Sequence, residues 1–154
     1  MSATRTSSVL GRVRTSYPRL LRILVPLDFS GKSRQALRYA VPVAQKFSAR
    51  IHLVHVLPAP GKTDKDEQIR QRTAALKRLG EMSQQLLPPR VRAEHAVLHG
   101  KPAEAILDLV RNQSIDLIVL TTKGRSGLKR ALIGSTAEQI MRDAPCPVMS
   151  VRRQ

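Results

Sequence analysis

The chain has little of what several protein classes depend on. It contains one cysteine, no tryptophan, two tyrosines and two phenylalanines among 154 residues. A single cysteine excludes an internal disulfide framework and is typical of a reducing compartment, so we expect a cytoplasmic protein. No apolar run approaches the ~18 residues that a membrane-spanning helix needs. The shortage of aromatic rings leaves little on which bases could stack, which argues against specific nucleic-acid binding.

Acidic residues are scarce as well. The chain has 11 Asp and Glu against 27 Lys and Arg, a formal net charge of +16, and such a surface attracts anions. The first acidic residue is Asp28, although arginines are frequent before it. This basic, Ser- and Thr-rich composition predicts a disordered tail over residues 1–20 ahead of a single domain over residues 21–154. A mitochondrial transit peptide has the same composition and is the alternative.

Apolar runs and helical periodicity alternate along the chain. The patterns predict strands from residue 22 and over 50–58, 92–100, 115–122 and 144–153, with helices over 32–47, 66–86, 101–113 and 135–143. Helical spacing places Phe47, Ile69 and Ala74 on inward helix faces. Strands separated by such helices pair in parallel, which predicts one open five-stranded, Rossmann-like α/β sheet with helices on both faces. Ligands bind such sheets beyond the carboxyl ends of the strands.

The segment "TTKGRSGLKRALIGST" (121–136) follows the fourth strand and leads into the last helix. Its glycines, Gly124, Gly127 and Gly134, let the backbone approach a ligand closely. The start of the following helix, at Ser135 and Thr136, offers free N–H groups and a partial positive charge. Hydroxyl and basic side chains surround these groups, so the segment predicts a phosphate site. A flexible, solvated loop is the alternative.

Five ordered blocks of the sequence are similar to the universal stress protein family. They are "ILVPLDFS", "HVLP", "KPAEAIL", "DLIVLTTKGRSGLKRALIGSTAEQI" and "APCPVMSVR", and they span residues 23–152. Nucleotide-binding members of that family carry Gly-x2-Gly-x9-Gly-Ser/Thr after the fourth strand. Here Gly124, nine residues and then Gly134-Ser135 match the second part of the motif, whereas Thr121 replaces its first glycine.

The resemblance implies a strand order of 3-2-1-4-5, ATP as the ligand and a homodimer joined through the last strand, at about residues 147–152. It implies that Pro26, Leu27 and Asp28 contact adenine and ribose and that Val56 touches adenine. Gly124, Gly134 and Ser135, with neighbouring loop groups, would hold the phosphates. The neighbouring loop residues are Thr121, Lys123, Arg125, Ser126, Gly127 and Thr136. Thr121 either crowds the sugar-phosphate or replaces a backbone contact with its hydroxyl.

The residues themselves give Asp28 two compatible roles. A carboxylate at the end of a central strand can accept hydrogen bonds from ribose or adenine, and it can also cap the following helix. Acidic residues near this predicted site are otherwise few, because Asp116 lies at the other end of the fourth strand. Hydrolysis of ATP needs more groups than these, so we expect a binding module with at most slow hydrolysis and any Mg²⁺ held mainly by the phosphates.

The expected role is a stress-response sensor or signalling dimer whose downstream partner the sequence does not reveal. A nucleotide-free interaction dimer of the same fold is one alternative, and a binder of anionic surfaces such as nucleic acid or membrane is another. The histidines form no chelating pair: His52 and His55 are three residues apart on a strand and point to opposite faces. We therefore predict no metal site. Because acidic residues near the predicted site are few, we also predict no catalytic residue.

Overall fold

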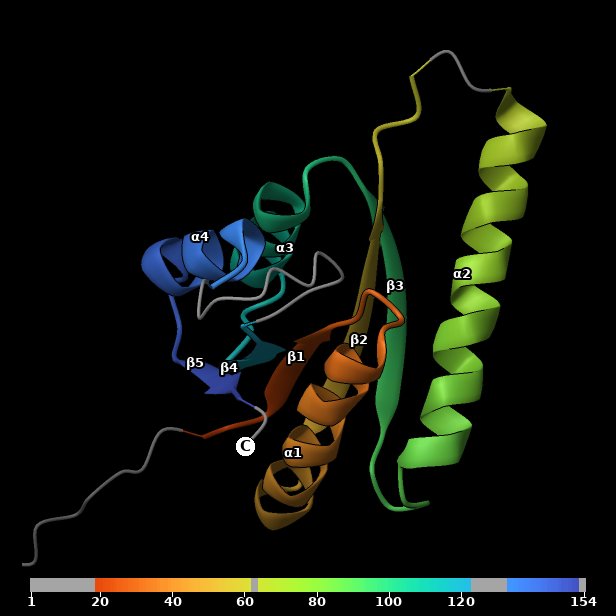
Figure 1. Cartoon of the computed structure of the whole chain (residues 1–154). Coiled ribbons are helices and arrows are strands. Elements are labelled where there is room, and N and C mark those ends of the chain that lie inside the picture. The colour runs from red at the N-terminus through yellow and green to blue at the C-terminus, as the bar shows by residue number, and fades with distance from the viewer. Residues whose placement is uncertain (1–18, 62–63, 123–132, 153–154) are drawn as a thin grey trace, which may run out of the picture.

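A computed structural model describes residues 19–61, 64–122 and 133–152. Within these ranges nine elements alternate as predicted, and Figure 1 shows their arrangement. The strands are β1 (Arg22–Pro26), β2 (Arg50–Leu57), β3 (Ala93–His99), β4 (Leu117–Thr121) and β5 (Val148–Val151). The helices are α1 (Gly31–Phe47), α2 (Lys65–Leu86), α3 (Pro102–Asn112) and α4 (Ser135–Asp143). No helix in these described ranges is both long and apolar enough to cross a membrane.

All five strands pair in parallel, in the order β3-β2-β1-β4-β5, which confirms the predicted fold and strand order. The order reverses between β1 and β4, since the chain leaves β1 towards β2 on one side and later returns to β4 on the other. The carboxyl ends of β1 and β4 therefore flank the crevice in which doubly wound sheets bind ligands.

The helices cover both faces of the sheet. Alternate residues of β1 enter different clusters: Ile23 and Val25 pack with α1 and α2, whereas Leu24 packs with α3 and α4. The apolar runs in β1 and β4 reflect this burial on both faces. Each fully buried side chain of this kind contributes about 1.5–3 kcal/mol to folding.

Three predicted inward residues are exposed: Phe47, Ile69 and Ala74. Phe47, the last residue of α1, is 52% exposed, and Ile69 in the early part of α2 is 62% exposed. The buried residues of α1 end at Ala44 and those of α2 begin only at Ala75. Helical periodicity identifies the apolar stripe of a helix, but the stripe is buried only over the length that the sheet covers.

Candidate functional site

A cavity of about 340 Å³ lies at the carboxyl ends of β1, β2 and β4, beside the first residues of α3 and α4. Eight of the residues predicted for the site line it: Pro26, Leu27, Asp28, Val56, Thr121, Gly134, Ser135 and Thr136. They come from three strand ends and the start of α4, which the strand order brings together. The other predicted residues, Lys123, Gly124, Arg125, Ser126 and Gly127, lie outside the described ranges.

The turn after β1 forms one wall of the cavity. Asp28 accepts a hydrogen bond from the backbone N–H of Ser30 through Oδ1 at 2.9 Å. The Oγ of Ser30 in turn accepts from the backbone N–H of Ser33 at 3.2 Å, so Ser30, not Asp28, is the N-cap of α1. Between them Phe29 has a φ of 62°, a conformation unusual for a residue with a side chain. The side chain of Asp28 thus helps to hold a tight turn at the edge of the cavity.

His55 supports the same turn and also lines the cavity. Its Nδ1 lies 2.6 Å from the carbonyl oxygen of Leu27, which can only accept, so Nδ1 is the protonated nitrogen. The imidazole ring lies 4.2 Å from the ring of Phe29, and the guanidinium of Arg78 lies 4.1 Å from the centre of that ring. Nothing in the local sequence distinguishes His55 from the other histidines. Its contact with Leu27 joins β2 to the turn after β1, and these segments are far apart in the sequence.

The start of α4 forms the opposite wall. The N–H of Gly134 donates to the carbonyl of Thr122 at 2.8 Å, and the first bond within the helix runs from Glu138 N–H to the carbonyl of Gly134 at 2.9 Å. The N–H groups of residues 135–137 therefore have no acceptor within the helix, and the N-cap residue, Gly134, has no side chain to cap them. These three residues line the cavity, so free amides and the positive end of the helix dipole lie at its wall.

Gly134 does not use the conformational freedom that is particular to glycine. Its φ of −64° and ψ of 144° are open to any residue. What glycine contributes at this position of the cavity lining is the absence of a side chain next to the first residues of α4.

The remaining lining is mostly apolar. Val54, Ile106, Leu120 and Ile140 are buried and meet the cavity from β2, α3, β4 and α4. Sequence reasoning did not identify them as site residues, because buried aliphatic side chains look alike in sequence whether they fill a core or line a pocket. An apolar lining with a few polar groups at one side is the usual composition of a small-molecule site.

Metal-binding geometry is not seen at the cavity or elsewhere in the described ranges, where no three His, Cys, Asp or Glu side chains cluster. His52 is buried on the face opposite to His55, and its Nδ1 lies 3.4 Å from Glu94. Burial lowers the pKa of His52, more than the nearby Glu94 raises it. Burial also raises the pKa of the Cys146 thiol, which favours the unreactive form.

Comparison with known proteins gives a family match over most of the chain. The model of the universal stress protein family matches residues 20–152. A universal stress protein of Methanocaldococcus jannaschii is 31% identical over 142 residues, which cover 86% of this chain and 82% of that protein. One from Thermus aquaticus is 32% identical over 136 residues, which cover 84% of this chain and 97% of that protein.

Solved structures show the same fold. The universal stress protein UspA from Lactobacillus plantarum has a TM-score of 0.76 and is 27% identical, over 88% of this chain and 100% of its own. A universal stress protein in complex with cAMP has a TM-score of 0.66 at 20% identity, over 89% of this chain and 100% of that one. One from Archaeoglobus fulgidus in complex with dAMP has a TM-score of 0.67 at 21% identity, over 88% of this chain and 100% of that one.

Proposed function

Because the chain belongs to the universal stress protein family, we propose that it binds ATP in the cavity between β1 and α4. The observation that carries the proposal is the pairing of an apolar lining with the free amides of residues 135–137 in one cavity. An adenine nucleotide has the same two parts, a flat apolar base and an anionic tail. The relatives solved with cAMP and dAMP both hold an adenine base with a phosphate, which supports this ligand class.

The proposed roles follow the two walls of the cavity. Adenine and ribose lie against Pro26, Leu27, Asp28 and Val56, with the Asp28 carboxylate accepting from a ribose hydroxyl or the adenine amine. The phosphates lie against Gly134, Ser135 and Thr136, where the helix dipole favours negative charge. The group that would complete the phosphate site comprises Thr121, Lys123, Gly124, Arg125, Ser126 and Gly127.

Binding rather than turnover is the proposed activity. Asp28 is the one carboxylate among the described residues that line the cavity. Phosphoanhydride hydrolysis usually requires metal-binding carboxylates and a residue that positions water, so we propose at most slow hydrolysis, with Mg²⁺ held mainly by the phosphates.

A homodimer through β5 is the proposed signalling form. β5 is an edge strand that pairs only with β4 among the described strands, and Met149 and Ser150 are exposed on it. An unpaired edge with an exposed apolar residue is a common site of association. Sedimentation velocity on the native protein should give a dimer, and Met149→Lys should shift it towards the monomer; a monomer at all concentrations would refute this part of the proposal.

The nucleotide proposal is tested by calorimetric titration of the purified protein with ATP, AMP and cAMP, together with native mass spectrometry of ligand that co-purifies. We expect saturable binding at one site per chain, strongest for ATP because it presents the most phosphate charge to α4. Absence of binding for all three, in a protein that still forms dimers, would favour the nucleotide-free interaction dimer instead.

A further inference from the structure

Several arginines lie at the amino ends of the strands, at the opposite end of the sheet from the nucleotide cavity. Arg22 and Arg50 lie directly opposite each other in the β1–β2 register. Arg92 comes next in the row, since it immediately precedes Ala93, the β3 partner of Ile51, and its carbonyl accepts from the N–H of Ile51 at 2.9 Å. Neighbouring strands lie about 4.8 Å apart, so Arg22 and Arg50 on β1 and β2 and Arg92 just before β3 stand side by side.

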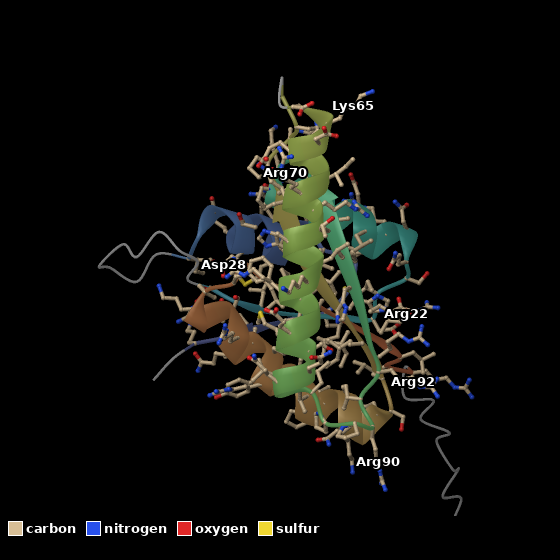
Figure 2. The ribbon with its side chains drawn as sticks, turned by 90° about the vertical axis from the view of Figure 1, so that its right-hand side faces the viewer. Arg22, Asp28, Lys65, Arg70, Arg90 and Arg92 are labelled. Atoms are coloured by element: carbon tan, nitrogen blue, oxygen red, sulfur yellow. The ribbon has the colours of Figure 1, made fainter. Side chains whose placement is uncertain are left out.

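These arginines surround a hollow of about 700 Å³. Arg90, from the connection before β3, joins Arg22, Arg50 and Arg92 in lining it, and the last turn of α1 closes one side. Figure 2 shows Arg22, Arg90 and Arg92 low on the right of α2, with Asp28 on its other side. No acidic side chain is among the described residues that line the hollow.

Part of the positive charge is balanced locally. Arg50 forms an ion pair with Glu94, and Arg22 donates to the carbonyl of Gln113 at 3.2 Å. The Asp116 carboxylate is engaged by the backbone, because its Oδ2 accepts from the N–H groups of Leu21 and Arg22, both at 2.8 Å. These two carboxylates stabilise the edge but leave an excess of guanidinium groups.

Arg90 and Arg92 form that excess. Both side chains are exposed, and within the described ranges neither forms a hydrogen bond or an ion pair. Like charges that line one hollow repel each other, and an anion in the hollow would relieve the repulsion. The planar guanidinium group binds phosphate oxygens in pairs, which makes arginine well suited to such a ligand.

We propose that this hollow is a second anion site, which binds a compact chain of two or more linked phosphoryl groups. A compact ligand fits better than a long nucleic acid, because the four arginines line one recess and no aromatic ring among the described lining residues could stack a base. The site is separate from the nucleotide cavity: Arg22 and Pro26 are at opposite ends of β1, about 13 Å apart for an extended strand. The proposal therefore does not depend on ATP binding at the other edge.

Inorganic tripolyphosphate is the probe, titrated by calorimetry into the full chain at fixed ionic strength. The test variant is Arg90→Ala/Arg92→Ala, whose exposed side chains can be removed without disturbing the core. The charge-matched control is Arg34→Ala/Arg38→Ala, two exposed arginines of α1 that line neither cavity. Gly134→Val is added to identify any tripolyphosphate that binds at the nucleotide cavity.

We expect the Arg90/Arg92 variant to bind tripolyphosphate about tenfold more weakly, with the Arg34/Arg38 control and Gly134→Val within about twofold of wild type. Equal losses in both arginine double variants would overturn the proposal, since they would show diffuse charge attraction. Loss in Gly134→Val alone would also overturn it, because the probe would then bind at α4. A single-stranded oligonucleotide is titrated into the same variants as a second probe. If the Arg90/Arg92 variant binds tripolyphosphate normally but no longer binds the oligonucleotide, the proposal is also overturned.

Discussion

Replacing Gly134 with valine separates ligand binding from folding. Because Gly134 has a φ of −64° and a ψ of 144°, valine can adopt its backbone conformation without strain. Valine is a poorer N-cap than glycine, which costs about 0.5–1 kcal/mol of stability. The variant should therefore fold, with a small decrease in its unfolding free energy.

The effect on ATP binding should be larger than the effect on stability. The valine side chain would occupy space beside the amides of residues 135–137, where the phosphates are proposed to lie. Loss of one hydrogen bond to a charged phosphate costs about 1.5–3 kcal/mol. This corresponds to a rise in the Kd for ATP of about 10- to 150-fold.

Calorimetric titration with ATP measures this change, and urea denaturation of the same samples checks the fold. Gly31→Val is the matched control, because Gly31 also opens a helix and a Cβ atom built there meets nothing within 4 Å. The control should bind ATP within about twofold of wild type. A folded Gly134→Val protein that binds ATP as tightly as wild type would refute the placement of the phosphates against α4.

Three further predictions concern single side chains. Asp28→Asn keeps an oxygen that can accept the hydrogen bond in the turn but removes the charge, so the calorimetric Kd for ATP should rise about fivefold; an unchanged Kd would remove Asp28 from the site. Burial lowers the pKa of His52, and also that of His95, below the usual 6.5, so the unfolded chain takes up protons first as the pH falls. The unfolding free energy, measured by urea denaturation, should therefore decrease as the pH falls below about 6.5. His52→Gln should make this decrease less steep, by less than the ~1.4 kcal/mol per pH unit that uptake of one proton gives. The same pH dependence in wild type and His52→Gln would contradict this prediction. Leu37→Ala, at a fully buried position, should lower the unfolding free energy by about 2–5 kcal/mol, whereas Phe47→Ala at the exposed end of α1 should change it by less than about 0.5 kcal/mol; similar losses would mean that Phe47 is buried in solution.

The order and type of the elements were predictable because their signals are local. Ser30 and Pro102 mark the starts of α1 and α3, and apolar runs mark the strands. The predicted exposure of single side chains was less reliable. Phe47 and Ile69 continue the apolar stripes of their helices but lie beyond the part that the sheet covers. The apolar stripe of a helix does not show how far along the helix the sheet extends.

The candidate site was predictable in part. The glycine-rich segment indicated the start of α4, and the resemblance to the universal stress protein family implied the turn after β1. His55 could not be recognised in this way, because its contact with Leu27 joins segments that are 28 residues apart. Its role depends on which strand lies next to β1.

The sequence by itself determined an alternating α/β chain with a glycine-rich segment after its fourth strand, since periodicity, caps and turn residues act over a few neighbouring positions. Only the tertiary structure decided that Arg22, Arg50 and Arg92 stand in one row and that a free helix end closes the cavity beside Asp28. Strand order and register set both arrangements. Order and register depend on packing between segments that are far apart in the sequence, so local sequence patterns do not specify them.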